Sequence, residues 1–148
     1  ETTETTEATE TTETEEERTP LQIISEEFEG APAVEMMTNW KAQFGSLHAF
    51  APDEETVYLF RPLRRLQHKN VTRDIRELSE TVAAQNNPAL VEEALHEKVI
   101  NSCVLYPAVT LETFTTSHAG LVPTLFNLIM EHSKFISPER AMASCYKL

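Results

Sequence analysis

The chain has 148 residues, of which 12 are basic and 24 are acidic, and its formal net charge is −12. This length is enough for one domain with a hydrophobic core, and the negative charge argues against a free nucleic-acid binder, which would need a basic face. No stretch approaches the roughly 18–20 consecutive apolar residues of a membrane span, so neither a membrane partner nor a signal peptide is expected.

Residues 1–18 are predicted to be an acidic, low-complexity arm. Residues 1–17 hold eight glutamates and no basic residue, and removing their charge from −12 leaves −4 for the rest of the chain. Because no large apolar side chain anchors the arm, we expect it to be disordered alone and ordered by a basic groove on a neighbouring protein. A solvated tail is the alternative. The glutamates predicted to bind a partner are Glu1, Glu4, Glu7, Glu10, Glu13, Glu15, Glu16 and Glu17.

The sequence begins with Glu rather than Met, which we expect either from processing or from an omitted upstream part. After the acidic arm, residues 19–32 are expected to be extended, as an edge strand or a docking arm. A helical core domain is predicted over 33–136, and its first helix covers about 33–44, with Gly45 suited to the C-cap. Residues 56–60 are β-branched or aromatic and predict a short β segment.

A polar helix is predicted over about 63–84, after Arg61-Pro62 ends the β segment. Arg61, Arg64 and Arg65 form a basic cluster at its start. One interpretation is a solvated helix start with local ion pairs. The other is a contact for an acidic partner surface, such as the Glu-rich arm of a neighbouring chain. The second interpretation makes these three arginines predicted partner-binding residues.

The two most apolar helices are predicted over about 88–106 and 123–134, and we expect them to form the centre of the core. In the first, apolar residues recur at three- and four-residue steps until Tyr106-Pro107 ends the helix. The second is apolar around more than half of its circumference, so we expect it to be buried on several sides. A short helix over about 110–114 is predicted between them.

Three further features carry local expectations. Trp40, the only tryptophan, is expected to anchor the core, and an exposed partner-binding Trp is the alternative. Cys103 lies at an apolar helical position, which predicts a buried and inert thiol, and with Cys145 it makes no disulfide framework. Ser137-Pro138 is typical of a helix start, so residues 137–148 are predicted to be a C-terminal helix or arm.

No catalytic, cofactor-binding or metal-binding residue is predicted. The five histidines are scattered, with no H-x-x-x-H pair and no cysteine spacing typical of a zinc site. Three glycines leave no phosphate-binding loop, and a nucleophile-elbow motif is absent. The sequence therefore predicts a mainly α protein, without cofactors, that binds other proteins. Its expected fold is a small helical domain with a short β segment and an extended acidic N-terminal arm.

Several phrases occur together in this chain. They are YLFRPL at 58–63, EKVINSCVLYP at 97–107, AGL at 119–121 with Leu125 and Ile129 after it, and SKF at 133–135. Their order, over about 57–135, resembles small tail proteins of contractile-tailed bacteriophages, of the baseplate-hub and tail-assembly-chaperone-like kind. In these, an aromatic-Arg-Pro-Leu phrase precedes one helix and a Cys-Val-x-Tyr-Pro phrase precedes an Ala-Gly helix. Their last phrase often reads Ser-Gly-Phe, where this chain has Ser133-Lys134-Phe135.

The resemblance implies a non-enzymatic structural protein of the tail baseplate or hub. Such a protein would be made in the host cytoplasm, be retained in the virion, and bind other tail and baseplate proteins or further copies of itself. A transient tail-assembly chaperone that leaves the particle is the first alternative. A small metal-dependent enzyme or regulator is the second.

Overall fold

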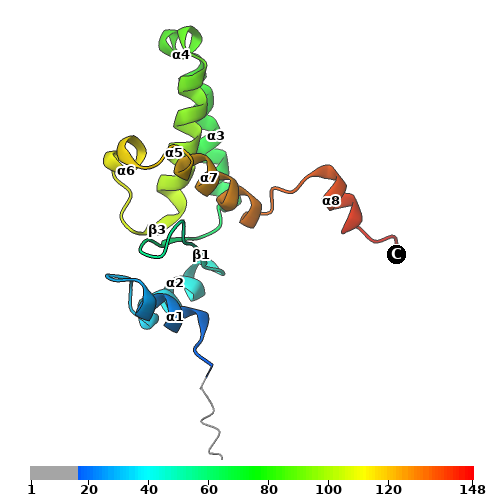
Figure 1. Cartoon of the computed structure of the whole chain (residues 1–148). Coiled ribbons are helices and arrows are strands. Elements are labelled where there is room, and N and C mark those ends of the chain that lie inside the picture. The colour runs from blue at the N-terminus through cyan, green and yellow to red at the C-terminus, as the bar shows by residue number, and fades with distance from the viewer. Residues whose placement is uncertain (1–16) are drawn as a thin grey trace, which may run out of the picture.

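A three-stranded antiparallel sheet separates two groups of helices in the computed structural model, which describes residues 17–148 (Figure 1). The strands are β1 (His48–Phe50), β2 (Tyr58–Phe60) and β3 (Val104–Tyr106), in the order β1-β2-β3. The β segment predicted at 56–60 is confirmed as β2, and it is the central strand. The two outer strands were not predicted.

Helices make up most of the described chain, which confirms the predicted mainly α fold class. They are α1 (Pro20–Glu27), α2 (Val34–Phe44), α3 (Arg65–Ser79), α4 (Val82–Asn86), α5 (Ala89–Cys103), α6 (Leu111–Thr116), α7 (Leu121–His132) and α8 (Pro138–Ala143). The α3 and α5 helices form a hairpin with α4 at its tip, and α7 packs across α5 near the base (Figure 1). The α1 and α2 helices lie together on the other side of the sheet.

The central strand holds two cores together because successive side chains of a strand point to opposite faces. Tyr58 and Phe60 join the larger core, which is built with α3, α5 and α7. Leu59 points the other way, into a smaller core with Met37 of α2 and Val57. All three β2 residues are buried, since both faces of this strand are covered.

The prediction that α7 lies at the centre of the core is confirmed. Leu125 is 1% exposed and Ile129 is 0% exposed, and both belong to the larger core. The helix begins at Leu121, slightly before its predicted start at 123. The prediction for residues 33–44 is also confirmed, and Gly45 at its C-cap has φ 85°, a conformation that glycine adopts without steric cost.

The prediction that residues 19–32 are extended is wrong, because Pro20–Glu27 forms α1. The Thr19 hydroxyl accepts a hydrogen bond from the Gln22 backbone N–H at 3.3 Å, and the Gln22 side chain accepts one from the Thr19 N–H at 2.8 Å. This capping box, with Pro at the first helical position, nucleates the helix. The Thr-Pro-x-Gln signal was present in the sequence and was overlooked.

Two predicted helix boundaries are also corrected. The helix predicted over 63–84 is two helices, because Thr81 starts α4 by accepting a hydrogen bond from the Ala84 N–H at 3.3 Å. The helix predicted to reach residue 106 ends at Cys103, whose carbonyl accepts a hydrogen bond from the Arg61 N–H at 3.0 Å. Pairing with β2 therefore converts the next three residues into a strand.

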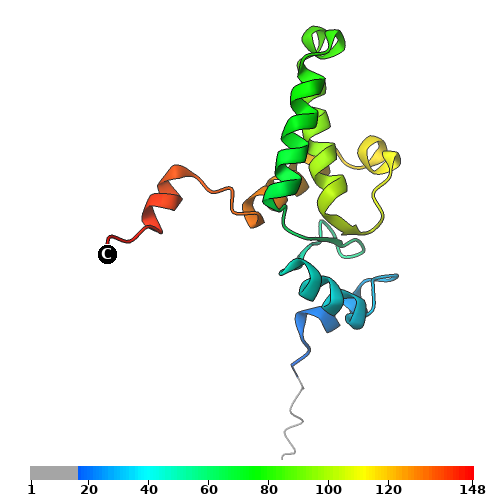
Figure 2. The same cartoon turned by 180° about the vertical axis from the view of Figure 1, so that it is seen from behind.

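The C-terminal arm, residues 137–148, leaves the body of the molecule and carries α8 (Figure 1 and Figure 2). Ser137 caps the helix by accepting a hydrogen bond from the Arg140 N–H at 3.3 Å, as its Ser-Pro start predicted. One ion pair ties the arm to the body, between Arg140 and Glu131 at 2.9 Å. Every residue of the arm is exposed.

Candidate partner-binding sites

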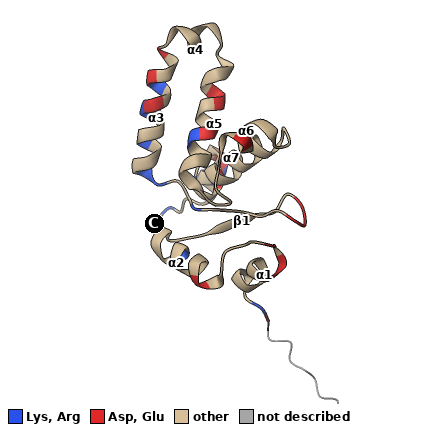
Figure 3. Cartoon of the chain, turned by 90° about the vertical axis from the view of Figure 1, so that its left-hand side faces the viewer, with Lys and Arg blue, Asp and Glu red and all other residues tan. Residues whose placement is uncertain are grey.

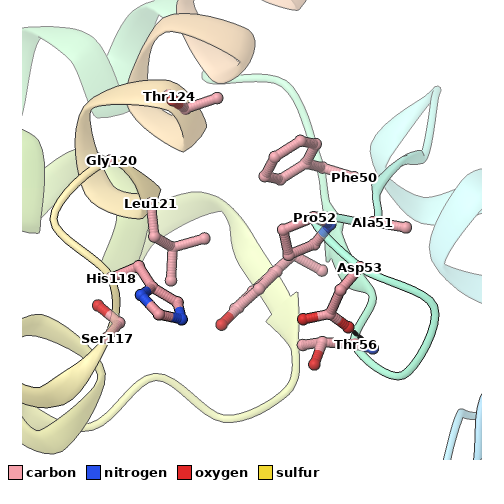
Figure 4. A pocket seen from close by; sticks show the side chains of 11 residues that line it. Phe50, Ala51, Pro52, Asp53, Thr56, Ser117, His118, Gly120, Leu121 and Thr124 are labelled. Atoms are coloured by element: carbon pink, nitrogen blue, oxygen red, sulfur yellow. Dashed lines mark hydrogen bonds between the residues drawn. The ribbon is translucent and has the colours of Figure 1, made fainter.

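A cavity of about 510 Å³ opens beside the loop that joins β1 to β2 (Figure 4). Its other wall is the segment between α6 and α7 and the first turn of α7. Phe50, Pro52 and Leu121 supply apolar surface, and Asp53 and His118 face the cavity from opposite walls (Figure 4). The volume lies within the range typical of sites for small ligands or single side chains.

Asp53 is the anionic group of this cavity. Its carboxylate accepts hydrogen bonds from the backbone N–H groups of Glu55 at 2.9 Å and Thr56 at 2.7 Å. These bonds lower the pKa of Asp53 because they stabilise its charged form. The carboxylate is therefore ionised near neutral pH and available to a cation.

Tyr58 supplies a hydrogen-bond donor to the same cavity. Its side chain is only 9% exposed, and among the described residues its hydroxyl has no hydrogen-bond partner. Burial and the charge of Asp53 raise the pKa of Tyr58, so its phenol stays protonated. An ionised carboxylate, a phenolic oxygen that can also accept a hydrogen bond, and apolar walls together suit an ammonium or guanidinium group carried on an apolar stem.

Of the predicted arginine cluster, Arg61 is used within the chain. Its guanidinium donates to the Gln67 side-chain oxygen at 2.9 Å and to the Ser102 carbonyl at 2.7 Å, and lies 4.7 Å from the centre of the Phe44 ring. One side chain thus joins the ends of α2, α3 and α5. Neither interpretation of the sequence foresaw this role, because the partners come from separate parts of the chain.

The other two arginines differ from each other. Arg64 donates to the Gln43 carbonyl at the end of α2, at 3.1 Å. Arg65 is exposed, and in the described part of the chain it makes no ion pair and no side-chain hydrogen bond. The cluster is therefore two structural arginines beside one that is available to a partner.

Basic positions continue along α3 beyond the predicted cluster (Figure 3). Residues spaced three or four apart lie on one face of a helix. This spacing relates Arg65, Lys69, Arg73 and Arg76, which are all exposed and which we call the α3 basic stripe. The sequence prediction stopped at Arg65, although the helical spacing alone could have extended it.

The eight predicted glutamates fall almost entirely outside the described residues. Glu17 is the first described residue, and it is exposed. Next to it, Arg18 forms exposed ion pairs with Glu26 at 2.7 Å and Glu27 at 3.3 Å, which connect the residue before the Thr19 cap to the last turn of α1. The predicted partner contact of the remaining seven glutamates stays a prediction. They are Glu1, Glu4, Glu7, Glu10, Glu13, Glu15 and Glu16.

The structure brings two of the scattered histidines together. The rings of His48 and His132 stack with their centroids 4.1 Å apart, and Phe60 lies beside both. Partial burial lowers the pKa of His48, and the nearby His132 and Lys134 lower it further. In the described part of the chain, no group of three or more His, Cys, Asp or Glu side chains could hold a metal ion.

The remaining sequence predictions concern Cys103, Trp40 and the membrane. Cys103 is fully buried, and burial raises its pKa to about 11, so the thiol is inert as predicted. Trp40 is partly buried and packs against the smaller core from outside its set of fully buried residues, so the expected core anchor lies at the edge of that core. In residues 17–148, no helix combines the length and the apolar character that a membrane crossing requires.

Comparisons of the chain with protein-family models, with curated proteins and with solved structures found no match. The resemblance to phage tail proteins therefore depends on the sequence phrases quoted above. The cavity, the α3 basic stripe and the C-terminal arm supply the structural argument for function.

Proposed function

We propose that this chain is a non-enzymatic structural protein of a bacteriophage tail baseplate or hub. It binds neighbouring virion proteins through its helical body and its arms. The observation that carries the proposal is the C-terminal arm, which extends from the body and presents large apolar side chains to solvent. The sequence phrases shared with phage tail proteins support the choice of a tail as the setting.

The arm is suited to docking on another protein. Met142 is 78% exposed and Tyr146 is 82% exposed, so a single copy of the chain gains nothing from burying them. Transfer of such side chains into a partner's groove contributes about 1.5–3 kcal/mol each. Tyrosine is also one of the residues that most often anchor protein interfaces. A short helix with apolar side chains that docks in a groove is a recurrent mode of peptide recognition.

The cavity beside Asp53 supports a second contact in the same assembly. Its carboxylate, the Tyr58 hydroxyl and the apolar walls match the side chain of a Lys or Arg on a neighbouring protein. Asn in place of Asp53 can still accept the two loop hydrogen bonds but lacks the charge. Asp53→Asn should therefore weaken incorporation into particles, whereas Glu54→Gln, an equal charge change on an exposed residue of the same loop, should not.

The principal test replaces both anchors of the arm, as Met142→Ser with Tyr146→Ser, in virus-infected cells. We expect the protein to fold and accumulate but to be lost from purified particles. The matched control is Met36→Ser with Leu111→Ser, because these side chains are 51% and 77% exposed but belong to the body. Equal incorporation of the arm variant and the control, measured by quantitative mass spectrometry, would contradict the proposal.

The same experiment separates the alternatives. A protein that binds tail proteins through its arm but is absent from purified wild-type particles is a transient tail-assembly chaperone. Stoichiometric metal in the purified protein, with loss of function on replacement of His96 or His132, would instead favour a metal-dependent enzyme or regulator.

The acidic arm is expected to add a charge-driven contact with Lys or Arg of another chain. Deletion of residues 1–17 should leave the domain folded and weaken incorporation into the particle. Incorporation that does not change at raised salt, where screening is strong, would count against a contact of this kind.

A further inference from the structure

Charge is strongly segregated along this chain. Six of the 12 basic residues lie within positions 61–76, although the chain as a whole is acidic. Eight of the 24 acidic residues lie within positions 1–17, where there is no basic residue. The two segments therefore carry opposite charge at the highest density found in the sequence.

The structure shows which of these basic groups are available. Arg61 and Arg64 are engaged with α2 and α5, as described above, which leaves the four residues of the α3 basic stripe. In the described part of the chain, Arg73 is the only member with an ion pair, to the adjacent Asp74 at 3.5 Å, and its side chain is still 63% exposed. Asp74 is shared with Lys98 at 3.6 Å, so it neutralises little of the stripe.

The surface of α3 is also shaped to receive side chains. A hollow of about 320 Å³ lies along the stripe. It is lined by His68, Lys69, Thr72, Arg73 and Arg76. Three of these five residues are Lys or Arg, and Thr72 and His68 add hydrogen-bonding groups. A carboxylate placed in this hollow would meet donors from two successive turns of the helix.

The acidic segment matches this surface in sequence. Its glutamates fall at every third position from Glu1 to Glu13, separated mainly by threonines, and three more follow at 15–17. We propose that, in the isolated chain and before any partner binds, the α3 basic stripe is the docking surface for the Glu-rich segment 1–17 of the same chain. A single surface ion pair contributes little binding free energy. Several carboxylates on one segment can bind several cations of the stripe at once, and their contributions then add.

The segment is long enough to reach its own stripe. Arg18 is held at the start of α1, and the end of α2 touches the start of α3 through the bond from Arg64 to the Gln43 carbonyl. The path runs along α1 and α2, whose 8 and 11 residues span about 12 Å and 16 Å. Seventeen extended residues span roughly 56–61 Å. Tethering also gives the segment a millimolar effective concentration, which favours its own α3 over that of a second copy.

The test places a nitroxide spin label on the segment of the full-length chain. Cys145→Ser removes the exposed thiol, Cys103 is fully buried, and Thr5→Cys supplies the labelling site. We expect the label to broaden the ¹⁵N-amide signals of residues 65–76 at low salt. The broadening should be lost at high salt, because the Debye length falls from ~30 Å at 0.01 M to ~3 Å at 1 M.

Two variants that each lose four positive charges test whether the contact is specific for the α3 basic stripe. Arg65→Gln, Lys69→Gln, Arg73→Gln and Arg76→Gln together should abolish the broadening. The control replaces four exposed cations elsewhere, as Lys41→Gln, Lys134→Gln, Arg140→Gln and Lys147→Gln, and should retain it. Dispersed amide spectra from both variants verify that each is folded.

Three results would overturn the inference. They are absence of broadening on α3, equal broadening in both variants, and broadening that appears only when labelled and unlabelled chains are mixed, which would assign the segment to a second copy. The inference concerns the isolated chain and does not rest on the proposed function. Failure here would leave the particle experiments above unaffected.

Discussion

The last two helices of the chain differ in how their apolar side chains are used. α7 buries Leu125 and Ile129 completely against the sheet and α5, whereas α8 leaves Met142 78% exposed. The difference comes from tertiary context, because α7 packs across α5, whereas in the described part of the chain α8 is tied to the body by the exposed ion pair between Arg140 and Glu131 of α7. Apolar side chains on α7 therefore stabilise the fold, and those on α8 are available to a partner. The predictions below test this division between body and arm.

The largest effect on stability is expected from substitutions in α7. Ile129→Ala or Leu125→Ala should each lower the free energy of unfolding by about 2–5 kcal/mol, because each leaves a cavity in the larger core. Urea denaturation of the purified protein measures this change. A loss below about 0.5 kcal/mol would show that α7 is not the centre of the core.

A smaller effect on stability is expected where the end of α7 is joined to the segment between β2 and α3. The Ser133 hydroxyl accepts a hydrogen bond from the backbone N–H of buried Leu63 at 2.7 Å. Ser133→Ala leaves this donor without its partner and should cost about 1–3 kcal/mol. The control is Ser144→Ala in the exposed arm, expected to change stability by less than about 0.5 kcal/mol. Equal losses of stability in Ser133→Ala and Ser144→Ala would contradict the expectation that side chains of the body stabilise the fold and those of the arm do not.

The pH dependence of stability should also originate in the body. The pKa of His48 is lowered from its ordinary value of 6.5, so the unfolded chain takes up the proton at a higher pH than the folded chain. This contribution to stability is complete above about pH 6.5 and is lost as the pH falls through the lower folded-state pKa. His48→Gln should reduce the loss of unfolding free energy between about pH 7.5 and 5.5. An identical loss of unfolding free energy in the His48→Gln variant and in the unchanged protein would contradict the prediction.

The smallest effect on stability is expected in the arm. Met142→Ser with Tyr146→Ser should change the free energy of unfolding by less than about 0.5 kcal/mol, because both side chains are already in water. The same variant is the one expected to be lost from particles. A large destabilisation would show that the arm packs on the body in solution.

Much of the fold could be predicted because its signals are local or periodic. The three- and four-residue apolar spacing placed most of α5, the apolar residues around more than half of the helix placed α7, and Gly45 placed the end of α2. Two elements were missed for a physical reason. β1 and β3 have three residues each, and a segment that short becomes a strand only by pairing with β2. α1 was missed differently, since the capping box at Thr19 was a readable signal.

The candidate sites were less predictable than the fold. Arg65 was identified correctly as an exposed cation, but the internal role of Arg61 depends on a carbonyl more than forty positions away. The cavity could not be predicted for the same reason, because its Asp53 and His118 come from distant parts of the chain. Helical spacing is enough to predict that the basic residues continue along α3. No rule of sequence spacing predicts that two loops from distant parts of the chain will lie side by side.

The sequence by itself determined the mainly helical class, the inert Cys103 and the separation of acidic from basic segments, because composition and short-range periodicity fix these properties. The tertiary structure alone decided that β2 holds a core on each face and that α8 stands apart from the body. It also decided which arginines are used inside the chain. These features depend on contacts between residues distant in sequence, and such contacts form only when the whole chain packs.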